Sequence, residues 1–394
     1  MSSFFTSFFT FLILVCAALW GGTPEAEALT IKAKAAVLME TKTGRVLFAE
    51  HKNKELPPAS LTKIMTLLLI MEAVDRGDLK LTDQIKTSAE AAGMGGSQVF
   101  LREGEVLTAG EIIKSIVMVS ANDASAAVAE HLAGSIEAFV SQMNKRAQEL
   151  GMKNTNFENE TGLPAENHYT SAYDIAIMAR ELLRHEQILE WSSTWLDSLR
   201  SGDFMLRNTN ELIRDPVGVD GLKTGFTHDA GFCLVATAAR KGMRLISVLL
   251  GAENNEQRLQ ESRKLLEYGF ENFSLVLVEK KNEPVGTARV EKGQNTKVQA
   301  YLQADYWMLV EKGKEKALRT ALVQQKLEAP LPAGTKVGNL QVFLDGRLIG
   351  EKEVITKEEV PRANVFVLIW RRIRIFLRNL FGMRLCHPLK KFII

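Results

Sequence analysis

Apolar residues follow two different spacings along this chain, and the change of spacing divides it into regions. Between Lys32 and Ala49 apolar positions alternate with others, which predicts two short strands joined at Thr43-Gly44. Spacings of three and four residues then take over and predict helices. The predicted helices cover residues 60–75, 109–119, 124–133, 135–150 and 171–185. Alternation returns at 232–239 and 244–250, which predicts two more strands.

Strands, a helical middle and strands again predict a sheet whose first and last strands lie together, with helices on its faces. A further helix at 256–270 closes this unit. The expected fold class is therefore α/β (α+β).

A second, smaller unit follows. Short alternating segments occur at 276–278, 296–302 and 341–344, with a turn at Leu331-Pro332-Ala333-Gly334. With 394 residues and roughly 150 residues per domain, two folded domains are expected. We assign 29–278 to the first domain and 279–362 to a small all-β domain, whose role is spacing or contact.

The N-terminal region has the composition of a secretory leader. Residues 4–20 are almost entirely apolar, and Ala26-Glu27-Ala28 places small residues where a signal peptidase needs them. We therefore expect a signal peptide at 1–28 that is removed before Leu29. The region before the apolar run has no Lys or Arg, so an uncleaved N-terminal anchor stays open as an alternative.

The C-terminal tail is basic and amphipathic. Residues 360–394 carry eight Lys or Arg and no acid, whereas 29–359 carry 41 basic and 45 acidic residues. A helical projection from Ile369 separates two sets: Arg371, Arg372, Arg374 and Arg378 on one side, and Ile369, Ile373, Phe376, Leu377 and Leu380 on the other. This pattern predicts that 363–394 anchors the chain to an anionic membrane surface; a helix packed on the body is the alternative.

The rest of the composition argues against several classes of protein and of binding site. The basic residues gather in a tail, so nucleic-acid binding is not expected. The three Cys lie far apart and the six His form no metal-binding motif, which predicts no metal, no cofactor and no disulfide framework. Cys233 follows an apolar alternation and is expected to be a core thiol.

The first chemical motif is Ser60-Leu61-Thr62-Lys63, which begins the first helix after Pro57-Pro58. Residues three apart share a helical face, so the Lys63 amine can take the proton from the Ser60 hydroxyl as it attacks. For that role the pKa of Lys63 must be lowered by burial or by a second cation. Alone, the motif is weak, because chance matches in helices are common.

The second motif is Ser120-Ala121-Asn122, between two predicted helices. Ser120 can relay a proton to the leaving group, and Asn122 can hold a substrate amide or Lys63. Simple helix capping is the alternative.

The third motif is Lys223-Thr224-Gly225-Phe226, in a predicted strand. Lys223 would supply a second cation and Thr224 a hydroxyl for a substrate carboxylate. Gly225 lets another backbone approach closely. The main-chain N–H groups of Phe226 and Ser60 can form an oxyanion hole.

Together, in this order and separated by 60 and 103 residues, the motifs are those of class A β-lactamases and penicillin-binding proteins. From about Leu29 to Ile394 the sequence resembles the D-alanyl-D-alanine carboxypeptidases of peptidase family S11. The resemblance extends to Thr155-Asn156-Phe157, Gly162-Leu163, the stretch 168–174 and Ala230-Gly231-Phe232. Two departures are Ala121, where many relatives have Gly, and a tail that is more basic and longer.

The resemblance implies a β-lactamase/transpeptidase-like sheet with a helical subdomain, and an enzyme of the bacterial envelope outside the cytoplasmic membrane. Its substrate would be peptidoglycan stem peptides ending in D-Ala-D-Ala, which acylate Ser60 and lose the terminal D-alanine. β-Lactam antibiotics would trap the acyl-enzyme. The resemblance also implies that Arg258 binds the substrate's terminal carboxylate. Glu160 and His168 are interpreted as shaping the loop near the site.

Three other functions remain open. A β-lactamase shares the motifs, but no E-x-x-L-N stretch lies between Asn122 and Lys223, and the chain continues for a further domain. A transpeptidase would pass the acyl group to an amine. A non-catalytic wall-binding protein would have no need for all three motifs together.

Overall fold

The computed structural model describes residues 29–381; the predicted signal peptide and the end of the tail lie outside the described residues. A five-stranded antiparallel sheet with the order β2-β1-β9-β8-β7 forms the centre of the first domain. Its strands are β1 (Ala35–Glu40), β2 (Val46–Glu50), β7 (Val219–Thr227), β8 (Gly231–Arg240) and β9 (Met243–Ala252). In β1, Val37 lies opposite Val248 of β9, which confirms that the first and last strands of this domain pair.

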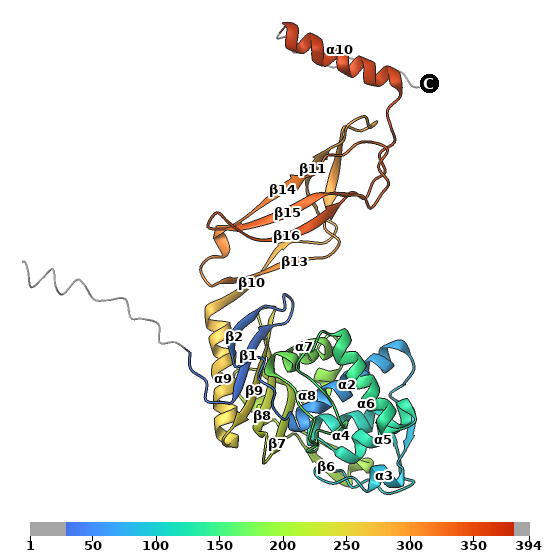
Figure 1. The fold of residues 1–394 in the computed structure, drawn as a ribbon, viewed down its shortest axis with the longest axis vertical. Coiled ribbons are helices and arrows are strands. Elements are labelled where there is room, and N and C mark those ends of the chain that lie inside the picture. Colours follow the sequence, from blue (N-terminus) through green and yellow to red (C-terminus); the bar gives the residue numbers. More distant parts are fainter. Residues whose placement is uncertain (1–28, 382–394) are drawn as a thin grey trace, which may run out of the picture.

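Helices cover both faces of this sheet (Figure 1). One face carries α9 (Asn255–Asn272), which packs on β8 and β9. The other face carries the helical subdomain, made of α2 (Lys63–Arg76), α4 (Ala109–Val119), α5 (Asn122–Ala133), α6 (Ile136–Glu149), α7 (Ala172–Leu182) and α8 (Ile188–Ser192). The largest apolar core lies between this subdomain and the sheet, and it includes Val37, Ile64 and Val248. The sheet and the helices therefore bury one another's apolar faces.

Some short elements were not predicted from the sequence. They are α3 (Ala89–Ala92) and the hairpins β3 (Gln84–Lys86) with β4 (Val106–Thr108) and β5 (Leu196–Leu199) with β6 (Phe204–Arg207). Strands of three or four residues are too short for an alternation to be recognised. The β5–β6 hairpin nevertheless matters, because its second strand leads directly into residues beside the site.

A separate all-β domain follows α9 and has its own core. One sheet pairs β10 (Phe273–Glu279) with β13 (Tyr306–Glu311). The other has the order β11-β12-β16-β15-β14 and consists of β11 (Pro284–Arg289), β12 (Lys297–Tyr301), β14 (Leu318–Gln324), β15 (Lys336–Leu344) and β16 (Arg347–Ile355). The expected α/β (α+β) domain followed by a small all-β domain is confirmed.

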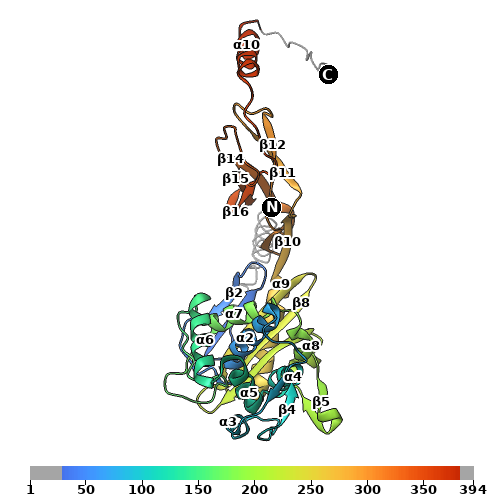
Figure 2. The same cartoon turned by 90° about the vertical axis from the view of Figure 1, so that its right-hand side faces the viewer.

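The last described element is the helix α10 (Val365–Phe381), at the end of the β domain far from the first domain (Figure 2). Arg371 at its middle donates hydrogen bonds to the carbonyl oxygens of Gly293 and Gln294, at 2.7 and 2.8 Å. Large apolar side chains on this helix are exposed, among them Phe366 at 83% and Trp370 at 58%. Within residues 29–381, no helix combines the length and apolar character needed to cross a bilayer.

Candidate active site

The Ser60 hydroxyl and the Lys63 amine lie together at the start of the first helix. Ser60 belongs to a short 3-10 turn, Ala59–Thr62, and the α-helix itself begins at Lys63, three residues later than predicted. Ala59 has a φ of +49°, so the chain enters the turn from a conformation that a regular helix does not allow. Even so, Lys63 Nζ lies 3.3 Å from Ser60 Oγ.

The Lys63 side chain is fully buried and surrounded by oxygen atoms. Its Nζ atom donates to Asn122 Oδ1 at 2.6 Å and to the Thr161 carbonyl oxygen at 2.7 Å. The orientation of the Asn122 amide is fixed because its Nδ2 group donates to the Gly95 carbonyl oxygen at 2.6 Å. A neutral amine has two hydrogens and one lone pair, so these two acceptors would take the hydrogens and leave the lone pair for Ser60.

Burial lowers the pKa of Lys63 to about 7, although the carboxylates of Glu160 and Asp123 act in the opposite direction. Desolvation disfavours the ammonium form because the site offers less polar stabilisation than water. A substantial fraction of Lys63 is therefore neutral at pH 7, as a general base requires.

The Ser120 side chain lies at the sharp turn between α4 and α5. Ser120 has a φ of +64° and ends α4, and Asn122 is the first residue of α5. The Ser120 Oγ atom is buried and has no hydrogen-bond partner in the described part of the chain. An unpaired buried hydroxyl costs free energy, so Ser120 is a candidate for a bond formed only when a substrate is present.

Strand β7 brings the third motif against Ser60. A Cβ atom added to Gly225 would lie 3.2 Å from Ser60 N, from the Pro58 carbonyl oxygen and from Ala59 Cβ. This close approach explains why glycine stands at 225. It also places Phe226, whose side chain is about half exposed, beside the start of the first helix.

Two further basic side chains lie at this strand. Lys223 is buried and donates to the Thr224 carbonyl oxygen at 2.9 Å. Burial, followed by the nearby charges of Lys63 and Arg258, lowers the pKa of Lys223 well below its ordinary value. Arg258, from α9, lies 3.4 Å from the carbonyl oxygens of Gly225 and Cys233, and its Nε atom is buried without a partner among the described residues. The nine predicted site residues thus lie on the 3-10 turn Ala59–Thr62, α2, the α4–α5 turn, β7 and α9.

Two residues beside the site were not singled out as site residues from the sequence. Thr161 contributes only its main-chain carbonyl oxygen, which leaves no side-chain signature. Thr209 places its Oγ1 atom 2.7 Å from Thr224 Oγ1. The one available signal for Thr161 was the neighbouring glycine: Gly162 has a φ of +85°, and its missing Cβ would overlap the Ala59 carbonyl oxygen.

Glu160 and His168 lie in the loop that carries Thr161. Burial lowers the pKa of His168 to about 4, so the ring is neutral at pH 7. Its Nε2 atom lies 2.8 Å from Thr62 Oγ1, and its Nδ1 atom accepts the Glu158 N–H at 3.2 Å. Glu160 is buried with both carboxyl oxygens unpartnered in the described structure, and burial raises its pKa. His168 thus holds the loop, while a Glu160 carboxylate would raise the pKa of Lys63.

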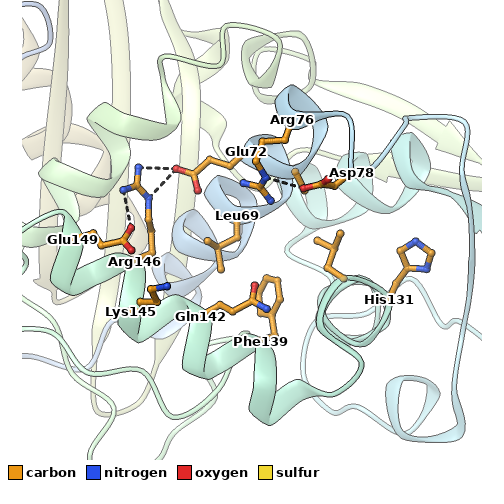
Figure 3. Close-up of a pocket in the computed structure, with 12 residues that line it drawn as sticks. Leu69, Glu72, Arg76, Asp78, His131, Phe139, Gln142, Lys145, Arg146 and Glu149 are labelled. Carbon is orange, nitrogen blue, oxygen red and sulfur yellow. Dashed lines mark hydrogen bonds and ion pairs between the residues drawn. The ribbon is translucent and has the colours of Figure 1, made fainter.

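A separate groove of about 550 Å³ lies on the helical subdomain between α2, α5 and α6 (Figure 3). Its floor includes Leu69 and Phe139. Its arginines already have carboxylate partners, since Arg146 lies 2.7 Å from Glu72 and Arg76 lies 2.7 Å from Asp78. The groove contains none of the site residues described above.

Comparison with known proteins defines the family. A family model described as D-alanyl-D-alanine carboxypeptidase matches residues 23–254, and one described as penicillin-binding protein 5, C-terminal domain, matches residues 273–362. D-alanyl-D-alanine carboxypeptidase DacF of Bacillus subtilis is 42% identical over 348 residues, which cover 87% of this chain and 90% of that protein. DacC of Escherichia coli is 33% identical, covering 94% and 95% of the two chains.

Solved structures agree with the sequence relatives. Penicillin-binding protein 5 from Haemophilus influenzae superimposes with a TM-score of 0.80 at 32% identity, over 87% of this chain and all of that one (100%). The ampicillin-bound penicillin-binding protein D2 from Listeria monocytogenes has a TM-score of 0.57 at 31% identity, over 61% and 99%. The chain belongs to the D-alanyl-D-alanine carboxypeptidase family, peptidase family S11, and is a serine-type carboxypeptidase of that family. The resemblance found in the sequence is confirmed.

Proposed function

We propose that this enzyme removes the terminal D-alanine of peptidoglycan stem peptides through an acyl-enzyme on Ser60. The observation that carries the proposal is the position of Lys63 Nζ, 3.3 Å from Ser60 Oγ and held by two further oxygen acceptors. This arrangement favours a neutral amine with its lone pair toward the hydroxyl.

In the first step Ser60 Oγ attacks the carbonyl carbon of the penultimate D-alanine while its proton passes to Lys63. The C–N bond to the terminal D-alanine then breaks, and Ser120 relays the proton held by Lys63 to the departing amine, which leaves Lys63 neutral again. The main-chain N–H groups of Ser60 and Phe226 stabilise the oxyanion. In the second step water attacks the ester carbon and gives a proton to Lys63, the C–O bond to Ser60 breaks, and Lys63 returns that proton to Ser60 Oγ.

Lys223, Thr224 and Arg258 receive the terminal carboxylate of the substrate. Lys223 and Thr224 are neighbours on β7, and Arg258 Nη1 lies 3.4 Å from the Gly225 carbonyl oxygen of the same strand. All three side chains are buried, which removes the water that would compete for an anion. The unpartnered Nε group of Arg258 is a donor that a carboxylate would satisfy. This set also accounts for specificity toward a free C-terminus.

Penicillins would acylate the same serine. The Listeria monocytogenes relative has been solved with ampicillin and with cefotaxime bound, which supports β-lactam binding in this family. Because the opened ring keeps its amine tethered, the adduct would persist longer than the acyl-enzyme formed from a peptide.

The enzyme would act in the bacterial cell envelope, exported by the leader 1–28 and attached to the outer face of the cytoplasmic membrane by residues 363–394. The catalytic domain would extend from Leu29 to the end of α9, and the β domain, from Phe273 of β10 to residue 362, would be a spacer. The boundary expected from the sequence, between residues 278 and 279, falls inside β10, which pairs with β13. Exposed apolar residues on α10 and the basic character of the tail support this arrangement.

The activity is tested by supplying the mature chain with a peptide ending in D-Ala-D-Ala and measuring free D-alanine. Release of one D-alanine per peptide without a new peptide bond supports the carboxypeptidase. Transfer of the acyl group to an added amine, in preference to water, would show a transpeptidase instead.

A further inference from the structure

Thr209 lies at the edge of the site, between the second and third motifs. Its main-chain N–H donates to the carbonyl oxygen of Met118, two residues before Ser120, at 2.9 Å. Its Oγ1 atom lies 2.7 Å from Thr224 Oγ1. The Thr209 side chain is exposed, whereas Thr224 is only 6% exposed. Thr209 therefore approaches the Thr224 hydroxyl from the solvent side.

The backbone on either side of Thr209 is firmly held. Asn208 is buried and donates through Nδ2 to the carbonyl oxygens of Ser192 and Thr194, at 3.1 and 3.0 Å. Asn210 is also buried and donates through Nδ2 to the Gly221 carbonyl oxygen at 3.0 Å. Two buried amides thus fix an exposed threonine, which is how a protein supports a functional side chain.

We propose that Thr209 is a positioning residue for substrate recognition: its hydroxyl donates to Thr224 Oγ1 and thereby directs the Thr224 hydrogen toward the substrate's terminal carboxylate. The proposal rests on the proposed function, in which Thr224 binds that carboxylate. A hydroxyl has a single hydrogen to donate, and a carboxylate can only accept. With substrate bound, Thr224 must donate to the carboxylate, so Thr209 must be the donor within the pair.

This order of donation strengthens recognition in two ways. A hydroxyl that accepts a hydrogen bond becomes a better donor, because successive bonds polarise one another. The Thr224 hydrogen is also prevented from turning toward Thr209. Both effects act on a carboxylate that is present in the bound substrate and in the transition state, so they should appear mainly in KM.

If the Thr209 hydroxyl had a purely structural role, Thr209→Val would lower the thermal stability of the protein. The proposal predicts no such loss. The segment 208–210 is already attached through Asn208, Asn210 and the Thr209 main chain, so loss of one exposed hydroxyl would not detach it. Thermal stability of a Thr209→Val variant should therefore stay close to that of the wild type.

The test is a double-mutant cycle on the full mature chain, with a peptide ending in D-Ala-D-Ala as substrate. Thr209→Val should lower kcat/KM about threefold to tenfold, mainly through KM, and Thr209→Ser should restore most of it. In a Thr224→Val background, adding Thr209→Val should cause no further loss. Thr194→Val is the matched control, because among residues 29–381 the Thr194 hydroxyl donates only to the Glu190 carbonyl oxygen.

The proposal would be overturned if the losses in kcat/KM caused by Thr209→Val and Thr224→Val multiplied in the double variant. It would also be overturned if Thr209→Ser were as impaired as Thr209→Val. A Thr209→Val variant with wild-type kinetics would overturn it as well. If the wild type releases no D-alanine, the proposed function fails and this inference fails with it. If the wild type is active and the two losses multiply, only the role of Thr209 is excluded and the proposed function stands.

Discussion

The Lys63 amine lies 2.6 Å from Asn122 Oδ1, although the two residues are 59 positions apart in the chain. This contact joins the first motif to the second. Together with the bond to the Thr161 carbonyl oxygen, it leaves the lone pair of the neutral amine free to accept the Ser60 proton. Burial holds the pKa of Lys63 at about 7. The chemistry of the site therefore depends on a lysine that titrates near neutral pH.

Acylation by a penicillin should rise with pH and reach half of its maximum near pH 7, where Lys63 loses its proton. The sign follows because only the neutral amine accepts the Ser60 proton. The measurement is the second-order rate constant for acylation between pH 5 and 9. A rate that keeps rising toward the ordinary pKa of lysine would contradict a neutral Lys63.

Glu160→Gln should move this profile to lower pH. The Glu160 carboxylate raises the pKa of Lys63, so replacing it with a neutral amide removes that effect and lowers the Lys63 pKa further. Glu158→Gln is the matched control, because Glu158 lies in the same loop but is exposed. If both variants keep the wild-type profile, Glu160 has no influence on Lys63.

Ser120→Ala should impair turnover without unfolding the protein. The Ser120 Oγ atom has no partner in the described structure, so its removal breaks no hydrogen bond there, and stability should change by less than about 1 kcal/mol. Loss of a proton relay should lower kcat by about 10²-fold or more. Thermal unfolding checks the expected stability, and steady-state kinetics checks the expected loss of kcat. Full activity would exclude Ser120 from the reaction.

Membrane attachment should depend on the apolar side of α10. Trp370 and Ile373 are exposed at 58% and 44%, and changing both to Glu should weaken binding to phosphatidylglycerol-containing vesicles at least ~100-fold. Val323→Glu, in an exposed position of β14, is the control. Vesicle sedimentation measures the effect. Equal binding by both variants would show that α10 is not the anchor.

The sequence predicted well those features that depend on local spacing. Ser60 and Lys63 are three residues apart and had to be neighbours in any helical turn. The pairing of β1 with β9 followed from strands at both ends of a helical region. Positions such as Val37 and Val248, buried on the neighbouring strands β1 and β9, gave a clear signal.

Features that depend on tertiary contact were harder to predict. The Thr161 carbonyl oxygen binds Lys63 through the main chain, which every residue possesses. Thr209 reaches Thr224 only because the β5–β6 hairpin returns the chain to β7, and that hairpin is too short to show a period. The 3-10 turn at Ser60 depends on the positive φ of Ala59, which is not a usual preference of alanine.

The central claim is that Ser60 is the nucleophile, and intact-mass analysis after incubation with a penicillin tests it most directly. The wild type should gain the mass of one penicillin, peptide mapping should place the adduct on Ser60, and Ser60→Ala should gain nothing. A wild type that stays unmodified, or an adduct that persists in Ser60→Ala, would contradict the account.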